Sequence, residues 1–186
     1  MRLKSHSQLQ GRHAFLSPSN YHWINYTEER LAERFVSAMA ARRGTELHDF
    51  AHEAIRLGIS LPDNGSTLSM YVNDAIRFEM SVEQPLHYSE NCFGHADTLS
   101  YVPGLLRVHD LKTGYIPGSH HQLEVYAALF CLDYIVSPFE IDMELRIYQS
   151  DEVRSFDPYP ETISHLMDKI ILFDQKIQQL KEEGAW

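Results

Sequence analysis

The sequence predicts an α/β fold, with a mixed central sheet of about four strands flanked by helices and an extra helical region at its N-terminal side. Residues 75–111 alternate in part between apolar and polar side chains, which is typical of strands. Segments before and after them space their apolar residues three and four apart, which is typical of helices. The predicted elements are helices, then three strands, a helix, a strand and a helix. This order is typical of an α/β core with a mixed sheet. With 186 residues, 44% apolar and 23% charged, the chain has the size and composition of a single domain spanning residues 1–186.

The N-terminal helical region is expected at residues 15–60, after a polar stretch at residues 1–14 that we predict to be a flexible leader. Ser17 is a candidate N-cap, and Pro18 suits the first position of a short helix. We expect the large side chains of this helix to lie in the core, with stacking on a nucleobase as the alternative. These side chains are Tyr21, Trp23, Ile24 and Tyr26.

Two longer helices are predicted next, one over residues 28–41 and one from Gly44 to about residue 57, where Gly58 stops it. The expected buried stripe of the first consists of Leu31, Phe35, Ala38 and Met39. That of the second consists of Leu47, Phe50, Ala51, Ala54 and Ile55. A loop at residues 62–66 and a short helix or turn around residues 68–74 complete this part.

The sheet core is expected at residues 75–150, and its first three strands form an antiparallel meander. The predicted strands are residues 75–86, which Pro85 ends, residues 92–102 and residues 105–111. The Pro-Gly pair at residues 103–104 predicts a hairpin turn between the last two of them.

A loop, a helix, a strand and a long helix are predicted in the remaining part of the chain. Residues 113–118 are the loop, and Ser119 caps a helix from residue 120 to about residue 134. The fourth strand is residues 141–148, and the C-terminal helix lies within residues 159–184. The side chains expected to pack are Val125, Leu129 and Leu132 on the first helix and Ile163, Leu166, Ile170, Phe173 and Ile177 on the last.

Composition restricts the class of protein. The net charge of −10 argues against a non-specific coat on nucleic acid, although residues 1–60 hold eight basic and six acidic side chains and could still face phosphate. No apolar run approaches the roughly 20 residues that span a bilayer, and the first residues lack the apolar core of a signal peptide. Cys92 and Cys131 form no CxxC pair, so we expect buried reduced thiols in an intracellular, cytoplasmic protein without a membrane partner.

Two acids and a lysine are set into the predicted hairpin. Side chains alternate along a strand, so Asp110 and Lys112 point the same way at the end of the third strand. Asp97 lies on the neighbouring strand, where its carboxylate can converge with that of Asp110. Two carboxylates suit a hard divalent cation such as Mg²⁺, and a nearby imidazole from His48 suits Mn²⁺ as well. The alternative is an exposed Asp-Lys ion pair, worth at most about 1 kcal/mol.

His48 also lies four residues from His52, so a zinc pair on one helix face is a further alternative. The motif order around them is not that of a zinc protease.

Four motifs together resemble the PD-(D/E)XK nuclease superfamily, and within it the RecB-like and phage recombination-exonuclease branch. In chain order they are Gly44-Thr-Glu-Leu-His48, Gly94-His-Ala-Asp97, Asp110-Leu-Lys112 and Gln122-Leu-Glu-Val-Tyr126. The stretch at residues 16–19 and the Trp-Ile-Asn stretch at residues 23–25 are similar to an N-terminal motif of related phage proteins. The resemblance covers about residues 15–150.

The resemblance implies a restriction-endonuclease-like core and a role for each motif. His48, Asp97 and Asp110 would be metal ligands, joined by the backbone carbonyl of Leu111, and Lys112 would be the catalytic lysine. Gln122 and Tyr126 would support the site or contact the DNA backbone, with Glu83 nearby. Several members carry four cysteines for an iron–sulfur cluster; this chain has two, so no cluster is expected.

The implied activity is Mg²⁺- or Mn²⁺-dependent hydrolysis of DNA, often exonucleolytic, in recombination, repair or phage replication. DNA is then the expected partner, with a separate recombinase, helicase or single-strand-binding protein, and the chain could form homo-oligomers. Two alternatives stay open: a nuclease-fold module that binds DNA or protein without cleavage, and a hydrolase of small phosphate esters.

Overall fold

The computed structural model describes residues 14–184, so the predicted leader lies outside the described residues except for Ala14. The chain divides into two compact units, residues 1–43 and residues 44–186. The boundary falls inside helix α1, Glu28–Arg56.

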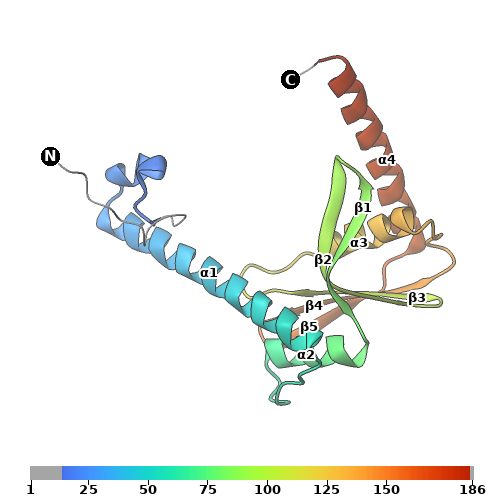
Figure 1. Ribbon diagram of the computed structural model, residues 1–186, viewed down its shortest axis with the longest axis horizontal. Coiled ribbons are helices and arrows are strands. Elements are labelled where there is room, and N and C mark those ends of the chain that lie inside the picture. Colours follow the sequence, from blue (N-terminus) through green and yellow to red (C-terminus); the bar gives the residue numbers. More distant parts are fainter. Residues whose placement is uncertain (1–13, 185–186) are drawn as a thin grey trace, which may run out of the picture. The chain divides into compact units, whose positions relative to one another are not determined.

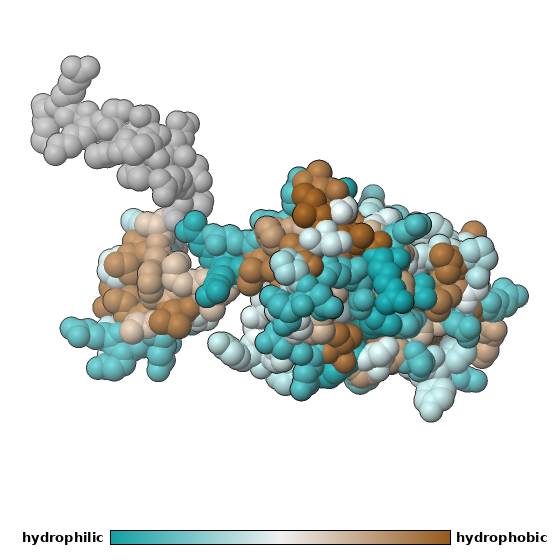
Figure 2. Space-filling model, turned by 90° about the horizontal axis from the view of Figure 1, so that it is seen from below, coloured by the Kyte–Doolittle hydropathy of each residue, from teal (hydrophilic) through white to brown (hydrophobic). Residues whose placement is uncertain are grey.

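The described part of the first unit begins with η2, Pro18–Asn25, a 3-10 helix. The prediction for its start is confirmed, because the Ser17 side chain accepts a hydrogen bond from the Ser19 N–H and Pro18 takes the first position. The expectation of a core position is wrong for Tyr21 and Ile24, whose side chains are exposed. Figure 2 shows much of this unit's surface in the brown and tan of apolar residues.

Helix α1 corrects two predictions. It is one helix rather than two, and Gly44 does not break it; a Cβ at Gly44 would lie 2.7 Å from Thr113 Oγ1, so this glycine permits a close approach instead. Its buried residues are Ala51, His52, Ala54 and Ile55. The predicted stripe residues Phe35, Met39 and Phe50 are exposed. The predicted end is confirmed, because Gly58 has a φ of +65° and donates its N–H to Ile55 O.

The second unit contains a five-stranded mixed sheet within the described residues, in the order β1-β2-β3-β4-β5 (Figure 1). The strands are β1 Ser81–Ser89, β2 Cys92–Val102, β3 Leu105–Leu111, β4 Asp142–Gln149 and β5 Glu152–Phe156. Neighbouring strands are antiparallel except β3 and β4, which are parallel. The α/β class, the mixed sheet and the antiparallel meander are thereby confirmed.

Strand β5 was not predicted. It follows a tight turn in which Ser150 and Asp151 both have positive φ, at 55° and 59°. Such turns usually carry Gly or Asn, so the hairpin leaves no ordinary signal in the sequence.

The start and end of β1 also differ from the prediction. Residues 75–77 belong to helix α2, Thr67–Arg77, which Ser66 caps. Pro85 does not end the strand, because β1 lies at the edge of the sheet, where proline is tolerated. Along this strand, the Gln84 side chain donates to Pro85 O, and the His87 N–H donates to Asp133 Oδ2.

Helices cover both faces of the sheet. Helices α3, His120–Asp133, and α4, Pro160–Glu182, pack over the face that presents Leu106 and Val108 of β3. Helix α2 and the residues of α1 in this unit share a second core with Leu111 and Tyr148. Ser119 caps α3 as predicted, by accepting from the His121 N–H.

Some predicted packing positions on these helices are wrong. Val125, Phe173 and Ile177 are at the surface, whereas Leu129 and Ile163 are buried. Cys131 is buried and Cys92 is half-buried, and both are free thiols. Among the described helices, none has the length and apolar character needed to cross a membrane.

Candidate metal centre

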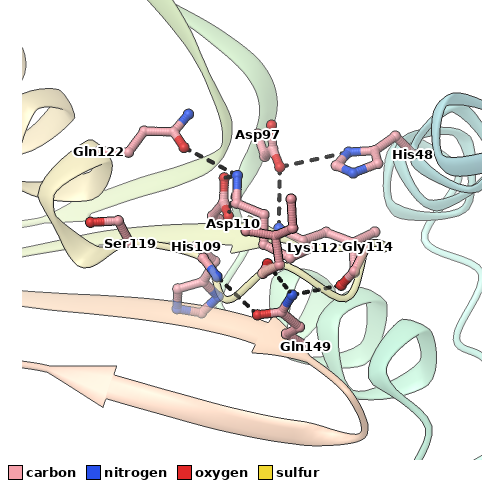
Figure 3. Close-up of polar contacts among 12 residues, drawn as sticks. His48, Asp97, His109, Asp110, Lys112, Gly114, Ser119, Gln122 and Gln149 are labelled. Atoms are coloured by element: carbon pink, nitrogen blue, oxygen red, sulfur yellow. Dashed lines mark hydrogen bonds and ion pairs between the residues drawn. The ribbon is translucent and has the colours of Figure 1, made fainter. Parts of the chain in front are cut away.

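The β2–β3 hairpin positions two carboxylates. Thr98 pairs with His109, so the next position places Asp97 level with Asp110. The Asp97 side chain reaches across to the end of β3, where its Oδ2 accepts the Leu111 N–H at 3.1 Å. Figure 3 shows Asp97 and Asp110 on neighbouring strands with Lys112 beside them.

Asp110 is buried beside its lysine. Its side chain is 4% exposed, and Lys112 Nζ lies 3.0 Å from Oδ1 and 2.9 Å from Oδ2. The Lys112 ammonium therefore lies against both oxygens of the carboxylate, and the contact to the buried Oδ2 is an ion pair. Burial, and then the charge of Asp97, raise the pKa of Asp110 to about 6, against the opposing effects of Lys112 and His48. The interpretation as an exposed ion pair is therefore wrong.

Lys112 is held from two sides. Its Nζ also donates to Gln122 Oε1 at 3.1 Å, from the first turn of α3, and its backbone N–H donates to Tyr148 O. Tyr126 lies one turn after Gln122 and packs on β2, where a Cβ at Gly94 would approach its ring to 3.1 Å. Gln122 thus contacts the lysine, whereas Tyr126 supports the hairpin.

Gly118 lies against the Lys112 stem, so Gly118→Ala is expected to displace the lysine. A Cβ there would lie 2.9 Å from Lys112 Cγ and 3.2 Å from Ile147 Cγ2, and the stem has to shift to accommodate it. If Lys112 is the catalytic lysine that the motifs imply, DNA cleavage should fall by about tenfold or more, because small misplacements of catalytic groups have large effects on rate. The matched control is Gly114→Ala in the same loop, where no described heavy atom lies within 4 Å of the new Cβ. Steady-state rates of both variants check this, and equal rates would contradict it.

His48 comes from α1 and lies within the second unit. Its Nδ1 is 3.6 Å from Asp97 Oδ2, so the structure brings it to the hairpin as predicted from the sequence (Figure 3). Glu83 approaches this set through His52, the neighbour of His48 on the same helix face. Its contacts are to Arg56, at 2.7 Å, and to His52, at 3.8 Å, and Arg56 lowers the pKa of the Glu83 carboxyl.

Gln149, at the end of β4, was missed by sequence reasoning. Its Nε2 donates to Gly114 O at 2.6 Å and to Ile116 O at 2.8 Å, and its Oε1 accepts the Gly118 N–H at 3.0 Å. It therefore fixes the loop between Lys112 and α3 (Figure 3). The only sequence signal is a polar residue at the C-terminal end of a buried strand.

A second polar group lies on the opposite face of the sheet and was also missed. The Tyr148 hydroxyl donates to Asp74 at 2.7 Å and lies 3.2 Å from His109 Nδ1, and Arg146 donates to Asp74 at 2.9 Å. Burial, followed by the charges of Arg146 and Arg107, lowers the pKa of His109 to about 3, so its imidazole is neutral. This network fixes the strands beneath the hairpin without touching the two carboxylates.

The residues at the hairpin fit an oxygen-preferring divalent cation. Asp97 and Asp110 lie level on neighbouring strands and offer carboxylate oxygens, which are the ligands that hard divalent cations prefer. A ligand role for the Leu111 carbonyl stays a prediction. No protein-family model, curated protein or solved structure gives a significant match to this chain.

Proposed function

We propose that the protein is a metal-dependent deoxyribonuclease of the PD-(D/E)XK type that hydrolyses phosphodiester bonds, acting from DNA ends. The observation that carries the proposal is the buried Asp110 with Lys112 Nζ 2.9 Å from its Oδ2, level with Asp97 on the next strand. The mixed sheet flanked by helices is consistent with the restriction-endonuclease-like core that the motifs imply.

The chain's own groups have distinct roles in this chemistry. Asp97 and Asp110 would hold Mg²⁺ or Mn²⁺, with His48 at the edge of the set. Bound there, such an ion would lower the pKa of a water molecule and offset charge on the phosphate. Lys112 orients the attacking water or stabilises the charge that develops on the phosphate oxygens. Gln122 holds Lys112 in place, because its Oε1 accepts a hydrogen bond from Nζ.

The test is a panel of linear, closed circular, single-stranded and double-stranded DNA with Mg²⁺ or Mn²⁺. Lys112→Met is expected to lower the rate by about 10²–10⁴-fold, the range for a group that transfers or orients a proton. The matched control is Lys176→Met, because Lys176 lies on α4 and its hydrogen bond is to Gln179.

Three results would contradict the proposal in different ways. Cleavage that survives both Asp110→Ala and Lys112→Ala removes the site assignment. DNA binding without turnover under any divalent ion favours the non-cleaving module. Nicking of closed circular DNA excludes an enzyme that acts only from ends.

A further inference from the structure

A second group of potential metal ligands lies beside the hairpin, within the second unit. One donor atom each of His48, His52 and Asp97 lie within 4.8 Å of one another. The two histidines are four residues apart on α1, so they lie on the same helix face, and their ring centroids are 6.0 Å apart. Imidazole nitrogen is a softer ligand than the carboxylate oxygens of the Asp97–Asp110 pair.

The environment of His52 marks it as more than a core residue. Its side chain is 6% exposed, and its Nε2 is buried without a hydrogen-bond partner among the described residues. Such an unpaired buried nitrogen is unfavourable unless something else binds it. On the other ring nitrogen, Nδ1, the Glu83 carboxylate lies 3.8 Å away, and Arg56 fixes that carboxylate with a 2.7 Å contact. At 3.8 Å this carboxylate is an ion-pair neighbour of the imidazole and leaves it without a hydrogen bond from Glu83.

We propose that His48, His52 and Asp97 form a binding site for a divalent first-row transition metal ion, with Zn²⁺ as the ligand their chemistry fits. Two imidazoles and one carboxylate are three of the four ligands of tetrahedral zinc, and water would fill the fourth position. This zinc site uses His48 and Asp97, which also belong to the Mg²⁺ or Mn²⁺ centre proposed above. Its third ligand is His52, whereas that centre uses Asp110. Binding of zinc at this site does not depend on whether the protein cleaves DNA.

His52 and Asp110 separate the two centres experimentally. In untagged, full-length protein, Zn²⁺ affinity is measured by competition with a chromophoric chelator, and Co²⁺ is used as a spectroscopic probe of tetrahedral geometry. His52→Gln is expected to lower Zn²⁺ affinity by more than the roughly 10–100-fold loss caused by removing an outer partner of a metal ligand. Asp110→Asn is expected to keep the Co²⁺ spectrum and to change Zn²⁺ affinity by much less than His52→Gln, because Asp110 acts on Asp97 and His48 through its charge alone.

Two further variants keep the test decisive. His48→Gln changes a half-buried side chain and replaces His52→Gln if that variant does not fold, as judged by circular dichroism. His121→Ala removes the other cluster of potential ligands in the described residues, His120, His121 and Glu124, where His121 already makes a 2.8 Å hydrogen bond to Glu124. It is expected to leave Zn²⁺ binding intact.

Either of two results would overturn the proposal. One is an unchanged Co²⁺ spectrum and Zn²⁺ affinity in His48→Gln and His52→Gln. The other is a loss of Zn²⁺ binding in Asp110→Asn equal to that in His52→Gln, which would place the ion between Asp97 and Asp110. A protein that binds Zn²⁺ through His52 but cleaves no DNA would support this inference and contradict only the nuclease proposal.

Discussion

Asp110→Asn is expected to abolish DNA cleavage and, at the same time, to make the metal-free protein more stable at neutral pH. Cleavage is lost because asparagine carries no charge for a cation and changes the partner of Lys112 Nζ. We expect a fall of at least about 10²–10⁴-fold in rate.

The gain in stability follows from the raised pKa. The folded state raises the Asp110 pKa from 3.8 to about 6, so the ionised carboxylate destabilises the folded state by roughly 3 kcal/mol at pH 7. This penalty already includes the favourable effect of Lys112, and asparagine resembles the protonated carboxyl, so we expect a gain of up to roughly 3 kcal/mol at pH 7.

The stability gain of Asp110→Asn is expected to depend on pH. The pKa of Asp110 is higher in the folded state than in the unfolded state, so the folded state binds the carboxyl proton more tightly. The contribution of Asp110 to the free energy of unfolding therefore falls as pH rises from about 4 to about 6. The advantage of Asp110→Asn should therefore be full above pH 6 and vanish near pH 4. Thermal unfolding in a chelator at a series of pH values measures it, with exposed Asp63→Asn as the control. A gain that does not change with pH would contradict the assigned cause.

Gln149→Leu is expected to destabilise the protein and to lower cleavage although Gln149 touches no reacting group. The variant removes three hydrogen bonds to the backbone at Gly114, Ile116 and Gly118. Each of these hydrogen bonds contributes about 0.5–1.5 kcal/mol, and their loss leaves buried backbone groups unpaired. We therefore expect the free energy of unfolding to fall by about 2–4 kcal/mol. The released loop carries Gly118, which packs on Lys112, so we also expect about a 10²-fold fall in kcat.

Three measurements separate positioning from a general loss of stability. Hydrogen exchange should speed up in residues 113–118. Gln149→Glu should be at least as disruptive as Gln149→Leu, because it sets a buried carboxylate oxygen against the carbonyl oxygens of Gly114 and Ile116. Gln84→Leu is the control, because Gln84 makes one exposed hydrogen bond to its neighbour Pro85. A kcat within twofold of wild type for Gln149→Leu would show that the loop does not position Lys112.

The β2–β3 hairpin and its site could be predicted because their signals are local. Alternating side chains, a Pro-Gly turn and the two-residue spacing of Asp110 and Lys112 define the hairpin without reference to distant parts of the chain. The contact of Lys112 with Gln122 also spans only ten residues and follows once Ser119 caps the next helix.

The errors arose where distant contacts override local preference. Gly44 looked like a helix break, but its missing Cβ makes room for Thr113, which is 69 positions away in the sequence. On the same helix, the apolar pattern placed Phe50 inside, whereas the structure buries His52 beside Glu83 and Asp97. A periodicity argument counts apolar residues as inward, so it cannot find a buried polar side chain such as His52.

The edge of the sheet at β1 bears on how the protein behaves in concentrated solution. A free strand edge is a template for strands of other molecules, and proteins avoid intermolecular sheet growth by blocking it. Here Pro85 has no N–H to offer, its carbonyl is occupied by the Gln84 amide, and the His87 N–H is occupied by Asp133. An incoming strand would find no regular ladder of donors and acceptors along this stretch, so β1 protects the protein from aggregation through this edge.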